Sequence, residues 1–376
     1  MSQPYPLPFH RPSSFLRALL VVYVFLIVYA SLYPFSGWQF AGILSLAGLY
    51  APLPRYWTWF DVLINVAGYV PLGILLATAV SPLLRGVKAF IFALIAGTLL
   101  SLAMEALQAY LPSRVSSNLD LITNAGGTFL GAFLGTVLSP LIFREDRIHY
   151  FIQRWLRFAS SHVLIIPMLW PLAQIYPQNY LFGHGEIFPV VSEWLSAFLG
   201  YPVNLTLKVT GGVQLTAEQY WLSETIITAT GLTAAILILL CVLQKTAPRI
   251  QLAGLMLAAA LLFKVMACAL FFEPKNALVW LTPGAIGGLL VGFLMLSGLI
   301  FTPPRVQRRM AIYLLLICLV SVNILPDNQY FVSTLQTWSQ GKFLNFNGAA
   351  HFMAMVWPFM ALWFLFRSIV NLRYSE

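Results

Sequence analysis

Six polar side chains occur as three pairs at helical spacing in a chain that is otherwise strongly apolar. The pairs are Asp61 with Asn65, Glu105 with Gln108, and Asp120 with Asn124. Residues three or four positions apart lie on one face of an α-helix, so each pair presents both side chains on the same side. A carboxyl group held in an apolar setting can act as a general acid or base. Glu105 and Asp120 are therefore the candidate catalytic residues.

A single arginine, Arg114, lies in the polar turn between the second and third pairs. Its guanidinium could bridge Glu105 and Asp120, or it could bind a phosphate or carboxylate group of a ligand. The predicted ligand-binding set is Asp61, Asn65, Glu105, Gln108, Arg114, Asp120 and Asn124. A structural alternative stays open, because amides and paired charges also join membrane helices and an aspartate at a helix start can cap it.

The segments that carry these residues are membrane-spanning in composition. The chain has 376 residues, of which 60% are hydrophobic and 9% charged, and its mean hydropathy is +0.82. A helix of ~20 apolar residues spans a bilayer, and the apolar runs have that length without the two-residue alternation of a barrel strand. The fold class expected is all-α, a polytopic transmembrane bundle of about ten helices. The expected spans are about 15–33, 60–80, 87–110, 119–143, 158–172, 221–243, 250–272, 278–301, 310–325 and 347–370.

The basic residues indicate the orientation of these spans. The net charge of +9 comes from lysines and arginines in short loops, which positive-inside topology explains without nucleic acid. Placing the N- and C-termini in the cytoplasm puts most of the basic residues on the cytoplasmic side. The turn that bears Arg114 then faces the extracytoplasmic side, and the polar pairs converge on the outer leaflet.

The same map predicts the domain organisation. Between the spans we expect an interfacial helix near 186–199 and a small β-hairpin around Gly211 and Gly212. The predicted divisions are a cytoplasmic tail at 1–14, a transmembrane domain at 15–143, a basic cytoplasmic loop at 144–157, a fifth helix with an extracytoplasmic segment at 158–220, and C-terminal transmembrane helices at 221–376. A shift of 163 residues pairs Asp61 with Glu224, which suggests that the last division is a degenerate repeat.

Three further polar residues inside or beside the C-terminal spans are secondary site candidates: Glu224, Lys264 and His351. Lys264 could pair with a carboxylate across the bundle. The three cysteines lie in apolar runs without metal-ligand spacing, so we interpret them as core residues. The sequence indicates no metal and no cofactor.

The polar motifs resemble those of the VanZ-like membrane proteins. The matching segments are D-V-L-I-N-V-A-G-Y-V-P-L-G from Asp61, E-A-L-Q-A-Y-L-P-S-R from Glu105 and D-L-I-T-N-A-G-G from Asp120. This resemblance covers about residues 15–143 and implies a bacterial inner-membrane protein. The member that names the family is linked to resistance to the glycopeptide teicoplanin, so a role in the cell envelope is implied, without an established reaction.

Three functions fit these observations. The first is a binding protein whose outer pocket takes an amphiphilic envelope ligand, such as a lipid-linked precursor or a glycopeptide, with Arg114 on its anionic head. The second is an intramembrane enzyme that uses Glu105 on such a ligand. The third is a transporter, although the acids lie near one membrane face, and a transporter is expected to carry them near the midplane. Membrane lipid is the one partner that all three share.

Overall fold

The computed structural model is helical throughout the part of the chain that it describes. It covers residues 14–33, 35, 37–39, 53–54, 56–80, 83–112, 116–142, 154–156, 164–213, 215–271, 274–326 and 344–373. Within these residues there are helices, turns and irregular segments, and no strand. The all-α polytopic prediction is therefore confirmed.

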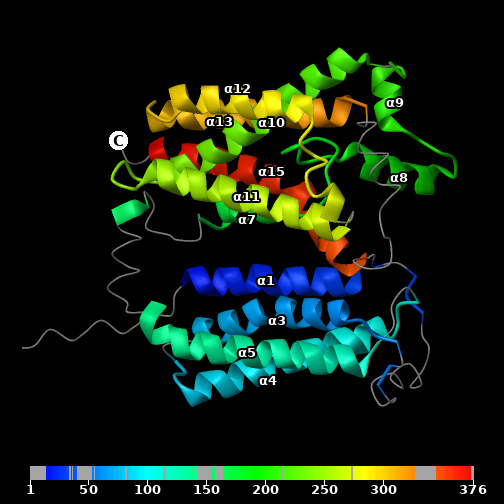
Figure 1. Ribbon diagram of the computed structural model, residues 1–376, viewed down its shortest axis with the longest axis vertical. Helices are drawn as coiled ribbons and strands as arrows, with labels where there is room; N and C mark the ends of the chain where they lie inside the picture. The colour runs from blue at the N-terminus through cyan, green and yellow to red at the C-terminus, as the bar shows by residue number, and fades with distance from the viewer. Residues whose placement is uncertain are drawn as a thin grey trace, which may run out of the picture. The chain divides into compact units, whose positions relative to one another are not determined.

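The chain divides into two compact units (Figure 1). Unit 1 contains residues 1–152 and 160–162, and unit 2 contains residues 153–159 and 163–376. Each unit has helices long and apolar enough to cross a membrane. These are Asp61–Ala79, Val87–Gln108, Ala217–Val242, Arg249–Ala269, Pro304–Ile324 and Ala349–Arg367. The total of about ten spans and the orientation of the termini stay predictions.

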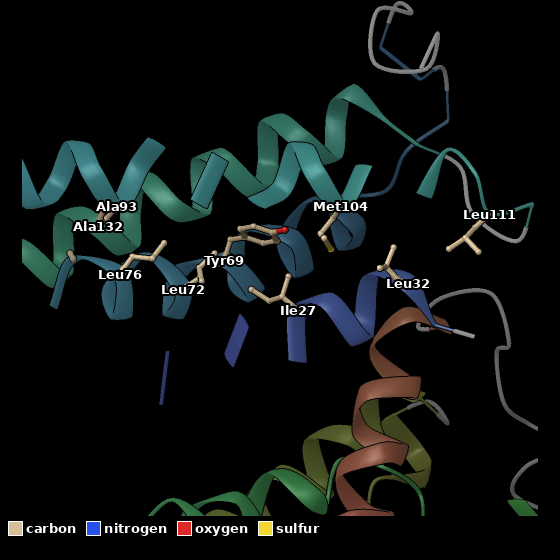
Figure 2. Packing of buried hydrophobic residues seen from close by; sticks show 10 residues of the cluster. Ile27, Leu32, Tyr69, Leu72, Leu76, Ala93, Met104, Leu111 and Ala132 are labelled. Carbon is tan, nitrogen blue, oxygen red and sulfur yellow. The ribbon is translucent and has the colours of Figure 1, made fainter. Parts of the chain in front are cut away.

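The described residues of unit 1 form a bundle of four helices. They are α1 (Ser14–Leu32), α3 (Trp59–Ala79), α4 (Val87–Gln108) and α5 (Asn118–Ile142). α3 packs against the other three and most extensively against α5. Figure 2 shows the core that they share, in which Ile27 of α1 and Met104 of α4 lie on either side of Tyr69 and Leu72 of α3. The polar candidates lie at one end of this core.

Glycines on α5 allow it to approach α3 closely. A Cβ at Gly127 would overlap Val66 O, and one at Gly131 would overlap Val70 O. One turn further along, the Cβ at Gly135 would lie 3.0 Å from Ile74 O. Each step of four residues along α5 matches a step of four along α3, so the two helices run parallel. Small residues are the usual means of close helix packing in membranes, where apolar burial gives no driving force.

Unit 2 is built around one buried helix, α10 (Ala217–Val242), which packs against α7, α11, α12 and α13. Nearly all of its residues from Ile227 onward are buried. The other helices are α7 (Ile165–Ala173), α8 (Phe188–Leu199), α9 (Leu205–Thr210), α11 (Arg249–Phe271), α12 (Pro283–Leu299), α13 (Pro304–Ile324) and α15 (Leu344–Arg373). A short 3₁₀ helix at Pro274–Asn276 precedes α12.

A second glycine seam joins α12 to α10. A Cβ at Gly284 would lie 2.8 Å from Trp221 O, and one at Gly288 would lie 2.9 Å from Thr225 O. This seam has the same parallel, four-residue register as the α3/α5 seam. The seam places Glu224 beside the first of its glycines. In unit 1, Tyr69 has this position beside the first seam glycine. The 163-residue shift instead pairs Glu224 with Asp61, so the seam and the shift disagree. The internal repeat itself stays a prediction.

Two local predictions differ from the structure. The β-hairpin around Gly211 and Gly212 is wrong, because the residues before these glycines form helix α9. The Asn204 side chain caps α9 by accepting a hydrogen bond from Leu207 N at 3.0 Å, and Gly211 ends it with a left-handed φ of 65°.

The expected fifth span at 158–172 contains only the nine-residue α7 in the part that the structure describes, and nine residues are too few to span a bilayer. The expected interfacial helix is present as α8.

Candidate functional site

The link between the first and third polar pairs is a hydrogen bond from α3 to α5. Asn65 donates through Nδ2 to Asp120 Oδ1 at 2.8 Å and lies 3.3 Å from Thr123 Oγ1. The α3/α5 glycine seam, which begins one turn beyond Asn124, sets this distance because it fixes how closely the helices approach. The structure thus brings Asn65 and Asp120 together, while their part in a ligand site stays a prediction.

Glu105 lies buried near the end of α4, only 3% exposed. Its Oε2 accepts a hydrogen bond from Ser117 N at 2.9 Å, just before α5 begins. The carboxyl group therefore joins the end of α4 to the start of α5. It also interacts electrostatically with Asp120, so two acids lie close together in a setting with little water.

Asn124, one turn beyond Asp120, faces α4. It donates through Nδ2 to Ser101 Oγ at 3.0 Å, and its Oδ1 is buried without a hydrogen-bond partner among the described residues. A ligand donor or a water molecule could occupy that oxygen. Among the predicted ligand-binding residues that the structure describes, Asn124 is the one with a fully buried acceptor that lacks a partner.

Sequence reasoning missed Tyr69 and Ser101. Tyr69 is buried on α3, hydrogen-bonds to Ser101, and interacts electrostatically with Glu105 and Asp120. The signal was available, because Tyr69 lies four residues after Asn65 and Ser101 four residues before Glu105, on the same helical faces. Figure 2 shows Tyr69 extending from α3 among the core side chains of unit 1.

Two of the predicted residues have structural roles. Asp61 is exposed and forms a capping box with Thr58: Asp61 N donates to Thr58 Oγ1 at 3.2 Å, and Asp61 Oδ2 accepts from Thr58 N at 3.1 Å. Gln108 donates through Nε2 to Ser31 O at 2.9 Å and so joins α4 to α1. Asp61 still adds negative charge to this end of unit 1, since it interacts with Asp120.

Arg114 lies outside the described residues, so its part in the site stays a prediction. The described residues of α3, α4 and α5 at this end of unit 1 supply three acids, three amides and the hydroxyl groups of Tyr69, Ser101 and Thr123. Within the described ranges, no group of three His, Cys, Asp or Glu residues could hold a metal ion. The chemistry available from the described groups is hydrogen bonding to a polar ligand and proton transfer through Glu105 or Asp120.

The secondary candidates all belong to unit 2. Glu224 is buried on α10 and hydrogen-bonds to Thr282, the residue that caps α12. His351 of α15 lies against the ring of Tyr176, with ring centroids 4.5 Å apart. Lys264 is buried on α11 and interacts with His184. Glu224 and His351 therefore have local partners of their own.

The Asn65–Asp120 hydrogen bond can be tested by a double-mutant cycle. Asn65→Ala and Asp120→Ala are each expected to lower the free energy of unfolding, with a coupling energy of about 1 to 2 kcal/mol between them, because the bond joins an amide to a charged acceptor in a partly buried place. Reversible denaturation of the full chain in mild detergent measures it. Asn65 with Asp61 serves as the control pair and should show no coupling. Equal coupling in both pairs would contradict this assignment.

Fold and site together define a multi-pass helical membrane protein with an acidic and amide-rich cluster at one end of its N-terminal bundle. The family model VanZ/LLP1 matches residues 16–139, which contain α1, α3, α4 and α5 except for the first two residues of α1 and the last three of α5. The chain therefore carries a VanZ-like domain in its N-terminal part, as the three motifs predict. No curated protein and no solved structure matches the chain.

Proposed function

We propose that the VanZ-like domain binds the polar head of an amphiphilic envelope ligand at the outer leaflet of the bacterial inner membrane. The ligand class is a lipid-linked cell-wall precursor or a glycopeptide, and the associated role is antibiotic resistance or envelope homeostasis. The domain match supports the family context. The choice of ligand rests on the chemistry of the cluster.

The buried cluster around Glu105 and Asp120 is the observation that carries this proposal. Acids and amides at the end of an otherwise apolar bundle suit a molecule with a lipid tail and a polar head, since the tail can lie along the lipid-facing helices. The head needs hydrogen-bond partners, and the buried Oδ1 of Asn124, which has none among the described residues, can accept a hydrogen bond from it. Arg114 would bind the anionic part of the head.

Binding of a fluorescent lipid-linked precursor to the purified full chain in nanodiscs tests the proposal. The wild type should bind saturably, and Glu105→Gln and Arg114→Ala should each weaken binding at least tenfold, because the first removes the buried carboxyl group of the cluster and the second removes the cation proposed to bind the anionic head. Glu218→Gln and Arg85→Ala remove exposed charges elsewhere and should bind as the wild type does. Unchanged binding by both site variants would overturn the proposal.

A second candidate function is hydrolysis or transfer on the same ligand. The electrostatic interaction between buried Glu105 and Asp120 favours it, because like charges held close together promote sharing of a proton and separate an acid from a base. Product formation from the precursor, absent in Glu105→Gln, would establish the enzyme. Stoichiometric binding without product would establish the binding protein.

A further inference from the structure

One segment of unit 2 is buried although it forms no helix. Residues 174–187, between α7 and α8, consist of turns and irregular backbone, yet Gln174, Tyr180, Phe182 and His184 are each no more than 3% exposed. Loops normally run over the surface, because their backbone groups need water. This segment is instead enclosed by helices of its own unit.

The segment reaches the central turns of α10 and α15. Thr228 Oγ1 donates to Leu181 O at 3.2 Å, and a Cβ at Gly231 would lie 2.6 Å from Phe182 O. Gly185 N donates to Ala354 O of α15 at 3.1 Å. Thr228 and Gly231 lie about 16 to 21 Å from the ends of α10 at the helical rise of ~1.5 Å per residue. Since α10 is a candidate span, we call residues 174–187, which lie beside its central turns, the re-entrant segment. Irregular backbone at membrane depth occurs only where protein covers it or where it lines a cavity.

Four polar atoms of the re-entrant segment and the helices beside it are buried and unpartnered among the described residues. They are Trp170 Nε1, Gln174 Oε1, Gln178 Oε1 and Lys264 Nζ. Trp170 and Gln174 lie at the end of α7, and α11, which carries Lys264, packs against α7. Lys264 also interacts electrostatically with His184 of the re-entrant segment. Native structures leave few buried groups unsatisfied, so four in one region need a reason.

The hydrogen bonds that are present decide which atoms remain free. The carbonyl of Phe182 can only accept, so His184 Nδ1 donates to it at 2.9 Å and Nε2 is the acceptor. Gln174 must then donate through Nε2 to His184 Nε2 at 2.8 Å, while Gln178 donates through Nε2 to Ala173 O at 2.8 Å. Both amide nitrogens are occupied. The free atoms are therefore two acceptors, on Gln174 and Gln178, and two donors, on Trp170 and Lys264.

Lys264 faces no acid in the part that the structure describes. The titratable groups that interact with it there are His184 and Cys268. Of the described acids in unit 2, Glu186 accepts a hydrogen bond from Asn179 and Glu224 hydrogen-bonds to Thr282. An ammonium group inside a membrane protein is costly without a counter-charge, and such residues mark functional sites.

We propose that these groups form a second binding site, in which Lys264 binds the anionic group of a small ligand and the free oxygens of Gln174 and Gln178 accept hydrogen bonds from its hydroxyl groups. Trp170 supplies a further donor. The ring of Trp170 lies 5.0 Å from that of Phe182, and the ring of His184 lies 5.6 Å from that of Trp357, so both Trp170 and His184 pack against further aromatic rings. The ligand class is a hydroxylated phosphate or carboxylate, free in solution or as a lipid head group.

Glycerol 3-phosphate is a suitable probe, since it combines an anion with hydroxyl groups. The full chain in phosphatidylcholine nanodiscs should show a saturable rise in thermal unfolding midpoint as the probe is added, while glycerol gives none. In a second arm, phosphatidylglycerol replaces part of the phosphatidylcholine without soluble probe. A response only in the second arm assigns the site to a lipid head group, and a response in the first assigns it to a soluble ligand. No saturable response in either arm would overturn the proposal.

Lys264→Met should raise the apparent dissociation constant for the probe at least tenfold, because methionine removes the cation and has an apolar side chain of similar length. Lys208→Met removes an equal charge from the exposed surface of α9 and should behave as the wild type. Gln178→Met provides a second site variant if Lys264→Met misfolds, and should also bind more weakly. Wild-type affinity in the folded site variants would contradict the site. Glu105→Gln should leave this response unchanged, which separates the second site from the function proposed for unit 1.

Discussion

Replacing Gly131 with alanine is expected to lower the free energy of unfolding of the protein by about 3 kcal/mol, the upper end of what overpacking costs. The new Cβ would overlap Val70 O and lie 2.8 Å from Val70 C and 3.0 Å from Gly73 Cα. All three are backbone atoms, so no side-chain rotation can relieve the overlap and the two helices must separate. Reversible unfolding of the full chain in mild detergent measures the change.

Gly126→Ala is the matched control, on the same helix five residues earlier. A Cβ at Gly126 meets nothing within 4 Å, and alanine favours a helix over glycine, so its unfolding free energy should equal or exceed that of the wild type. Separation of α3 from α5 should also lengthen the Asn65–Asp120 contact. Gly131→Ala is therefore expected to reduce the coupling energy of that pair. Equal stability of the two alanine variants would show that the glycine seam does not hold the bundle together.

Helical spacing predicted the polar faces of unit 1 but not their partners. Asn65 of α3 meets Asp120 of α5, whereas Asp61 turns back to cap its own helix and Gln108 reaches Ser31 of α1. Spacing along one helix defines which residues share a face. It doesn't define which neighbouring helix that face meets, because rotation about the helix axis is set by packing such as the glycine seam.

The β-hairpin failed for a local reason. The alternation in residues 203–216 suits a strand, but the same residues also allow a six-residue helix, and the Asn204 cap with left-handed Gly211 selects the helix. An alternating pattern is weak evidence for a strand when the same residues include a good helix cap. The cap gives a hydrogen-bond partner to an amide that a short isolated hairpin would leave to water.

The re-entrant segment could not be predicted from sequence. Residues 174–187 contain Pro, Asn, Gly and His, a composition typical of an exposed loop. Their burial depends on partners far away in the chain: Thr228, Cys318, Asn323 and Ala354 all contact the backbone of the segment. Lys264 was recognised as unusual for its position in a span, but the groups that surround it became evident only from the structure.

Asn323→Leu is expected to destabilise the re-entrant segment by about 3 to 5 kcal/mol. The Asn323 side chain accepts from Ile187 N at 2.8 Å and from Phe188 N at 3.0 Å, and donates to Gly185 O at 2.9 Å. Leucine has a similar size and removes these three bonds together with the Asn323 bond to Leu319 O. The part-buried amides of Ile187 and Phe188 and the buried carbonyl of Gly185 then lose this partner at about 1 to 3 kcal/mol each, with incomplete additivity. Faster hydrogen exchange at Ile187 and Phe188, measured by mass spectrometry on the full chain, is the expected result.

Asn323→Asp separates the two kinds of contact. Its carboxylate still accepts from the two amides but cannot donate to Gly185 O, so exchange at Ile187 and Phe188 should stay slower than in Asn323→Leu. Ser297→Ala, which removes only a local bond to Leu294 O on α12, should exchange as the wild type does.

Because residues 180–185 pack against central turns of α10 and α15, the segment that Asn323→Leu destabilises should also expose new protease sites between α7 and α8. Wild-type exchange and protease resistance in Asn323→Leu would show that packing alone holds the segment in place, and that its hydrogen bonds to α13 contribute little.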